Sequence, residues 1–170
     1  MAKHYFEDFK AGQTFFGSSR LSVDKADILR FAAEFDPQPF HLDEEAAKNS
    51  LFGALAASGW HTSAMTMRLL VDSQAPVAGG LIGLGVEDLR WPLPVRAGDT
   101  LRVEFEILGT RESKSRPQQG LVRMQISTFN QRDEIVQRSV NTIIVPRRTF
   151  AAAAEQSRTS GGLPSEGRKE

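Results

Sequence analysis

The residues whose types and spacing could carry out a reaction gather in one short segment, Phe35–His41 (FDPQPFH). A carboxylate and an imidazole that share one water molecule can take a proton from it and later return one. Asp36 and His41 are five positions apart, so a fully extended chain would separate their Cα atoms by about 16–18 Å. Pro37 and Pro39 each fix φ, which favours a rigid bend that brings the two side chains together. The segment therefore predicts an acid–base site.

The same spacing also has a plain structural interpretation. An Asp and a His separated by four residues form a short and degenerate pattern. If a helix ends here and a surface turn follows it, Asp36 is solvated and His41 packs incidentally. Spacing alone leaves both interpretations open.

Helices are expected on both sides of this segment. Before it, apolar residues recur at helical spacing, at Ile28, Phe31, Ala32 and Phe35. This helix follows the capping side chains of residues 21–24 and is expected to end at Asp36, because Pro37 disfavours the α conformation in the residue before it. Asp43–Asn49 predicts one or two further helical turns. Gly59–Val71 is apolar or small almost all round, which predicts a buried helix.

After about residue 80 the apolar period changes to two, as in half-buried strands. Apolar and polar residues alternate over 101–107 and over 122–128, and a β-branched run closes 135–145. Residues 130–133 predict a hairpin connection, and residues 97–99 predict a turn. Gln13–Gly17 predicts an edge strand. Together, these helices and strands predict an α+β arrangement in which four or five mainly antiparallel strands fold over one long buried helix.

Composition excludes several classes of protein. The 170 residues suit one domain, and the absence of cysteine, with only three histidines, excludes disulfide scaffolds, thiol nucleophiles, iron–sulfur clusters and cysteine-rich zinc sites. Lys+Arg and Asp+Glu both number 21, so the basic excess typical of nucleic-acid binding is missing. The charge-free run Leu51–Met67 is too polar to span a membrane. Because no apolar signal core stands at the start, we expect a cytoplasmic protein.

Four motifs, in order along the chain, resemble those of the MaoC-like hydratase/dehydratase family. The resemblance covers most of the chain, from about Tyr5 to Pro146. The motifs are Asp36–Asp43 (DPQPFHLD), Gly53–Thr62 (GALAASGWHT), Leu89–Leu101 (LRWPLPVRAGDTL), and Ser113–Pro117 (SKSRP) followed by Gly120–Val122.

This resemblance implies a single hotdog fold, a curved antiparallel sheet wrapped around a long central helix. It also implies (R)-specific hydration of a trans-2-enoyl-CoA to the 3-hydroxyacyl-CoA, or the reverse dehydration. Asp36 would take a proton from water and deliver one to Cα, while His41 would help to hold and activate that water. The backbone N–H of Gly59, at the start of the central helix, would bind the thioester oxygen as negative charge develops there.

The sequence departs from the family pattern near these residues. The family usually has asparagine where Gln38 stands, small residues where Glu34 and Phe35 precede the aspartate, and frequently histidine at the position of Ser58. We assign Gln38, Ser58 and Trp60 to substrate binding. Phe35 adds bulk that would restrict the acyl pocket.

Other residues have two interpretations. Lys114, Ser115 and Arg116 would bind CoA phosphates if the resemblance holds, whereas as an isolated charge run they would form a solvated hairpin tip. His61 is expected to be a hydrogen-bonded core histidine, and the alternative is a second polar group in the site. The dispersed histidines predict no metal site. CoA would be the carrier of the substrate, and no cofactor is expected.

We thus expect one hotdog domain over residues 1–146 and a disordered tail over 147–170. A hotdog sheet leaves an edge strand and a face uncovered, so we expect a homodimer or higher homo-oligomer with CoA bound across the interface, and no nucleic-acid or membrane partner. Two alternative functions stay open. One is a hotdog acyl-CoA thioesterase, and the other is a non-catalytic acyl-binding or partner subunit.

Overall fold

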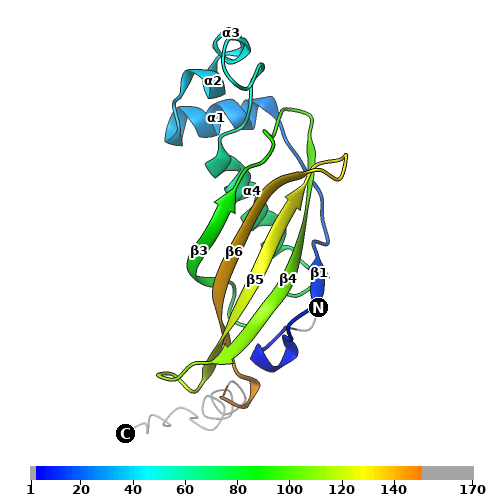
Figure 1. Cartoon of the computed structure of the whole chain (residues 1–170), viewed down its shortest axis with the longest axis vertical. Coiled ribbons are helices and arrows are strands. Elements are labelled where there is room, and N and C mark those ends of the chain that lie inside the picture. The colour runs from blue at the N-terminus through cyan, green and yellow to red at the C-terminus, as the bar shows by residue number, and fades with distance from the viewer. Residues whose placement is uncertain (1–2, 151–170) are drawn as a thin grey trace, which may run out of the picture.

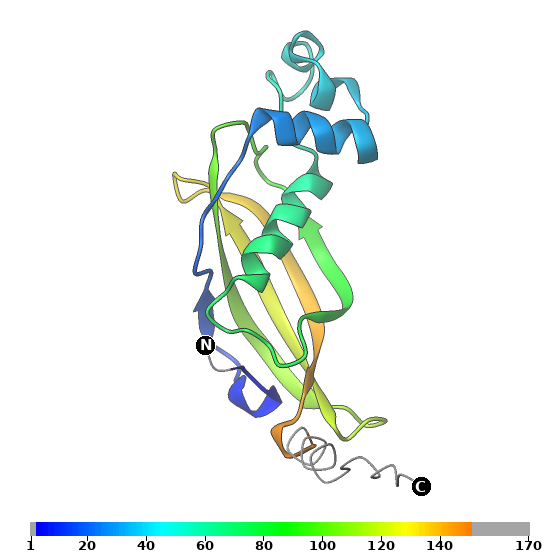
Figure 2. The same ribbon diagram turned by 180° about the vertical axis from the view of Figure 1, so that it is seen from behind.

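One antiparallel sheet and one central helix make up the body of the molecule (Figures 1 and 2). The computed structural model describes residues 3–150. The strands lie in the order β1-β4-β5-β6-β3, with β2 also paired to β4. Their bounds are β1 Thr14–Phe16, β2 Leu21–Ser22, β3 Ile82–Arg90, β4 Thr100–Glu112, β5 Gln119–Phe129 and β6 Ile135–Pro146.

The helices separate into a central one and a group at one end of the sheet. Figure 2 shows α4 (Gly59–Val71) lying across one face of the sheet, while the other helices gather beyond its upper end. These are α1 (Lys25–Phe35), α2 (Pro39–Leu42) and α3 (Glu44–Lys48); a short 3₁₀ turn, Phe6–Asp8, precedes β1. Met65 and Leu69 of α4 pack onto inward residues of the long strands, such as Val103, Ile107 and Ile126, to form the core.

Most of the predicted elements are confirmed. The helix before Pro37 ends at Phe35, with Asp36 as its C-cap, and the side chain of Asp24 caps its start by accepting from Ala26 N–H at 2.7 Å. The helix over Gly59–Val71 has the predicted bounds. The strands follow the period-two segments, because alternating residues on one face of each strand pack against α4. The short helix α2 was not predicted.

The prediction that the helix over Gly59–Val71 is buried all round is wrong for one of its faces. The sheet covers one side of α4, but Trp60, Met67 and Val71 on the other side are 61%, 47% and 58% exposed. Strand β3, at the end of the sheet, also leaves apolar side chains exposed, namely Ile82, Leu84 and Val86. A single chain therefore presents an apolar surface made by α4 and β3.

The chain beyond β6 is only partly described. Arg148 bonds both carboxylate oxygens of Asp8, at 2.7 and 2.6 Å, and its guanidinium lies over the ring of Tyr5. Residues 151–170 lie outside the described residues, so the disordered tail stays a prediction for them. None of the helices that the structure describes is long and apolar enough to cross a membrane.

Candidate active site

The bend between Asp36 and His41 is built from a helix end and a new helical turn. Asp36 leaves the α conformation at φ −149° and ψ 67°. The chain then turns so that Gln38 N–H donates to the carbonyl of Asp36 at 2.7 Å. Pro39 starts α2 at the first helical position, where its fixed φ fits and its missing N–H costs nothing. The predicted bend is thus confirmed. The helical turn α2 was not predicted, although Pro39 at its first position could have indicated it.

The bend brings the two predicted acid–base groups together. Asp36 Oδ2 lies 3.6 Å from His41 Nε2, and the two side chains are 18% and 6% exposed. His41 Nδ1 lies 2.8 Å from the carbonyl oxygen of Ala56. A carbonyl can only accept a hydrogen bond, so neutral His41 carries its proton on Nδ1 and presents a lone pair at Nε2.

Two side chains hold the Asp36 carboxylate in place. The hydroxyl of Ser58 donates to Oδ2 at 2.6 Å, and the amide of Gln38 donates to Oδ1 at 2.7 Å. These bonds, first that from Ser58 and then that from Gln38, lower the pKa of Asp36 below its ordinary value of 3.8. Asp36 is therefore ionised at neutral pH.

An ionised carboxylate oxygen and an imidazole lone pair are both acceptors, and 3.6 Å is too long for a direct hydrogen bond. A water molecule that donates one hydrogen to Asp36 Oδ2 and the other to His41 Nε2 would satisfy both groups. Its oxygen would then keep its lone pairs free for attack on an electrophile. This pair can therefore bind and orient a nucleophilic water.

The N-terminus of α4 lies next to this pair. Ser58 is its N-cap and accepts from Trp60 N–H at 3.2 Å, and Gly59 is its first residue. The first N–H groups of a helix have no carbonyl partner within the helix, and the positive end of the helix dipole favours negative charge there. A Cβ at position 59 would lie 2.8 Å from ring atoms of Trp91, so the close approach of that ring requires glycine.

A cavity of about 550 Å³ opens beside these groups. His41, Gly59 and Thr62 line it, with Arg96 and a mainly apolar wall of Leu51, Phe52, Ala57, Trp91, Pro92, Leu93, Pro94 and Val95. Asp36 is not one of the lining residues, but its Oδ2 lies 3.6 Å from Nε2 of His41, which is one. The site therefore combines an oriented acid–base pair, free helix N–H groups and an apolar pocket.

The structure brings together some of the predicted site residues and not others. Asp36, His41 and Gly59 converge, and Gln38 and Ser58 bond Asp36. The bond from Ser58 to the carboxylate was not predicted from the sequence, although a serine before Gly59 could have indicated the N-cap. Trp60 packs edge-on against Trp91 at a centroid distance of 5.5 Å and is largely exposed.

Lys114, Ser115 and Arg116 lie far from these residues within one chain. They belong to the connection between β4 and β5, which lies at the opposite end of the sheet from α1–α3 (Figure 1). His61 stacks on Phe31 at 4.6 Å, away from the cavity lining, and its buried Nδ1 has no hydrogen-bond partner among the described residues. It packs in the core as expected, without the predicted hydrogen bond.

Within residues 3–150, no three His, Asp or Glu side chains lie close enough together to hold a metal ion.

Comparison with known proteins identifies the family. Residues 8–128 match the MaoC like domain. The chain belongs to the MaoC-like domain family. The crystal structure of the MaoC-like dehydratase from Rhodospirillum rubrum is similar, with a TM-score of 0.81 and 56% sequence identity over 85% of this chain and 98% of that chain. These matches confirm the single hotdog fold.

Two curated relatives extend the comparison. The uncharacterised protein YdeM of Bacillus subtilis (strain 168) is 32% identical over 141 residues, which cover 83% of this chain and 98% of YdeM. The (R)-specific enoyl-CoA hydratase of Rhodospirillum rubrum is 31% identical over 107 residues, 62% of this chain and 71% of that enzyme. The prediction of a hydratase/dehydratase enzyme is thereby confirmed.

The contact between Ser58 and Asp36 in this MaoC-like site leads to a first prediction. In Ser58→Ala the first donor to the carboxylate is lost, so the pKa of Asp36 is expected to rise toward 3.8. Titration of the Asp36 carboxyl carbon by ¹³C NMR measures the shift. Ser139→Ala removes a buried hydroxyl that bonds Asn141 instead, and it is expected to leave this titration unchanged. An unmoved pKa in Ser58→Ala would contradict the role given to that hydroxyl.

Proposed function

We propose that the protein catalyses the (R)-specific hydration of a trans-2-enoyl-CoA to the 3-hydroxyacyl-CoA, or the reverse dehydration. The observation that carries the proposal is the pair of acceptors, Asp36 Oδ2 and His41 Nε2, held 3.6 Å apart beside the N-terminus of α4. Relatives that bear the names (R)-specific enoyl-CoA hydratase and 3-hydroxybutyryl-CoA dehydratase support it.

Each group has a part in the addition of water. Asp36 and His41 hold the water, and as its oxygen bonds to C3 of the enoyl group, its proton passes to Asp36. The electron pair of the C2–C3 double bond moves toward the thioester oxygen, where the N–H of Gly59 binds the developing negative charge. Asp36 then returns the proton to C2, and the thioester carbonyl is restored. Dehydration follows the same steps in reverse.

One assay separates the proposal from its two competitors. The protein is incubated with crotonyl-CoA and, separately, with a saturated acyl-CoA. Loss of the enoyl absorbance, with formation of the (R)-3-hydroxy product, supports the hydratase. Release of free thiol instead would identify a thioesterase, and inertness toward both substrates over several chain lengths would identify a non-catalytic acyl-binding subunit. Either of the last two results would overturn the proposal.

We further propose that the protein acts as a homodimer formed through the apolar surface of α4 and β3. Strand β3 ends the sheet, and an exposed strand edge can pair with a second strand. The exposed side chains of Trp60, Met67 and Val71 continue this surface. A second copy, related by a two-fold axis, would cover both features at once. A cytoplasmic location stays a prediction.

In such a dimer, the residues that bind the CoA of one active site would come from the partner subunit. Lys114 and Arg116 belong to the connection between β4 and β5, which lies at the opposite end of the sheet from α1 and α2, the helices on either side of Asp36 (Figure 1). Antiparallel pairing of two β3 edges places the far end of one subunit beside the near end of the other. The phosphates of CoA would then meet the hairpin of the partner subunit while the acyl group reaches Asp36 of its own.

A complementation experiment tests this arrangement. The double variant Lys114→Ala/Arg116→Ala is expected to raise KM for crotonyl-CoA about tenfold or more, since charge-assisted hydrogen bonds contribute roughly 1.5–3 kcal/mol each. Heterodimers of this variant with Asp36→Asn, purified with two tags, are expected to recover a low KM, because one site combines an intact Asp36 with an intact partner hairpin. A KM that stays high in the heterodimer would contradict binding across the interface.

A further inference from the structure

One side chain holds the irregular segment between α3 and α4 that forms a wall of the cavity. The guanidinium of Arg96 donates through Nη2 to the carbonyl of Phe52 at 2.6 Å. Through Nη1 it donates to the carbonyls of Ala54 and Leu55 at 2.9 and 3.2 Å. Three main-chain carbonyls within four residues are therefore fixed by one planar group.

The next residues of this segment hold the acid–base pair. The carbonyl of Ala56, adjacent to Leu55, accepts the hydrogen bond from His41 Nδ1 at 2.8 Å. Ala57 N–H donates to the carbonyl of Val95, the residue before Arg96, at 2.8 Å. Ser58, which bonds Asp36, follows directly. The position of the Ala56 carbonyl thus depends on the segment that Arg96 fixes.

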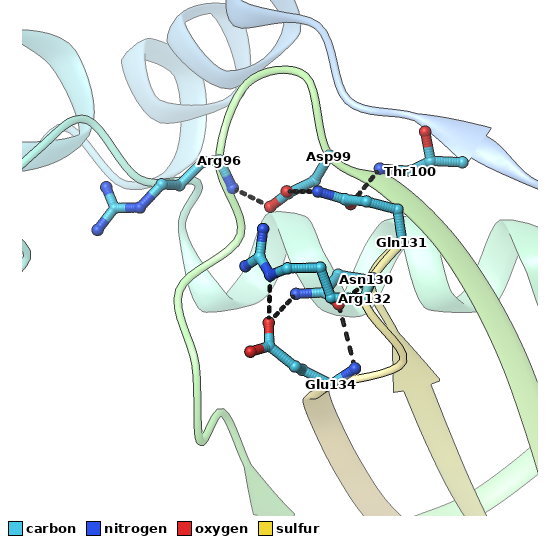
Figure 3. Close-up of polar contacts among 7 residues, drawn as sticks. All are labelled: Arg96, Asp99, Thr100, Asn130, Gln131, Arg132 and Glu134. Atoms are coloured by element: carbon cyan, nitrogen blue, oxygen red, sulfur yellow. Dashed lines mark hydrogen bonds and ion pairs between the residues drawn. The ribbon is translucent and has the colours of Figure 1, made fainter.

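Arg96 is itself anchored to the sheet (Figure 3). Its backbone N–H donates to Asp99 Oδ2 at 2.8 Å, across a turn in which Gly98 has a φ of +87° that favours glycine. The other oxygen of the buried Asp99 accepts from the amide of Gln131 at 2.9 Å, and Gln131 Oε1 accepts from Thr100 N–H at 3.0 Å. Figure 3 shows the guanidinium pointing away from Asp99, so the backbone and side chain of Arg96 join different parts of the molecule.

The geometry points to Arg96 as a positioning residue that sets the tautomer and orientation of His41 through the carbonyl of Ala56. Arg96 also lines the cavity, but its guanidinium bonds the carbonyls of the cavity wall, so we assign it a role that acts through His41. Lysine can replace it only in part, because a single ammonium on a flexible stem does not match three carbonyls as a planar fork does. The expected change in kcat rests on the proposed hydratase function. The expected change in the tautomer of His41 does not depend on that function.

The tautomer can be observed directly. The chain has three histidines, so long-range ¹H–¹⁵N spectra of protein labelled with ¹⁵N-histidine are simple, and His41→Gln assigns the His41 signals. In the wild type at pH 8, His41 is expected to carry its proton on Nδ1. In Arg96→Met it is expected to change to a mixture of tautomers, and Arg96→Lys is expected to lie between. A wild-type His41 protonated on Nε2 would overturn the inference.

Kinetics with crotonyl-CoA provide the second readout. A misplacement of about 1 Å in a catalytic group can cost about 10²-fold, so kcat of Arg96→Met is expected to fall between about 10-fold and 10²-fold. KM is expected to change much less than kcat, because the guanidinium is bonded to the carbonyls of the cavity wall, and Arg96→Lys is expected to recover part of kcat. If the wild type turns over no enoyl-CoA, the proposed function fails, and the tautomer experiment still decides the role of Arg96.

A matched control is Arg102→Met. Arg102 has a side chain that is 22% exposed, and it binds the carboxylates of Glu104 and Asp133 on the sheet. Its replacement is expected to change neither the His41 tautomer nor kcat. Equal losses of kcat in the two methionine variants, or an unchanged tautomer and kcat in a folded Arg96→Met, would overturn the inference. If Arg96→Met does not fold, Arg96→Lys is judged by the same two readouts.

Discussion

In Asp36→Asn, the rate of crotonyl-CoA hydration is expected to fall by about 10²–10⁴-fold, because a positioned acid–base group contributes a factor of this size. An amide can accept the hydrogen bond from Ser58, but it cannot take the proton of the water or deliver one to C2. KM is expected to change much less than kcat. Initial rates at the enoyl absorbance measure the effect.

The control for this variant is Asp27→Asn, which neutralises a carboxylate in α1, the helix that Asp36 follows as C-cap; Asp27 is paired with Arg30. Its activity is expected to stay near that of the wild type, and an Asp36→Asn variant within tenfold of the wild type would remove Asp36 from the mechanism.

The pH dependence of stability provides a second check on Asp36. Because the pKa of Asp36 is lowered on folding, its ionised form stabilises the protein above pH 3.8, and this contribution is lost as pH falls through the folded-state pKa. The difference in unfolding free energy between wild type and Asp36→Asn should therefore shrink in acid.

Replacing His41 with glutamine is expected to have a similar effect, a loss of about 10²–10⁴-fold in kcat. The glutamine amide can still donate to the carbonyl of Ala56. Its remaining polar atom is an amide oxygen, however, which is a far weaker base than an imidazole nitrogen, so water loses the basic acceptor that His41 Nε2 provides. Rates measured under the same conditions as for Asp36→Asn test this expectation.

His61→Gln is the matched control for His41→Gln. Both histidines are buried, His61 at 8% exposure and His41 at 4%. His61, however, stacks on Phe31 and does not line the cavity. We expect His61→Gln to keep kcat within a few-fold of the wild type even if its stability falls. A large loss of kcat in folded His61→Gln would assign that histidine to the site, as the alternative interpretation of the sequence allowed.

Local features of the sequence determined much of this protein. The bounds of α4 and the end of α1 follow from apolar spacing and from Pro37, and the strands follow from their period of two. These signals are local, because helix and strand periods are fixed by backbone geometry. Asp36 and His41 were predicted for a similar reason, since only five positions separate them and two of the intervening residues are prolines.

The tertiary structure alone decided which groups from distant parts of the chain meet. Ser58 bonds Asp36 from 22 positions away, and Arg96 bonds the carbonyl of Phe52 from 44 positions away. It also decided that α4 leaves one face uncovered and that Lys114 lies at the far end of the sheet. Such contacts depend on how the elements pack together in space, and sequence periodicity reports only which face of an element is apolar and not what covers that face.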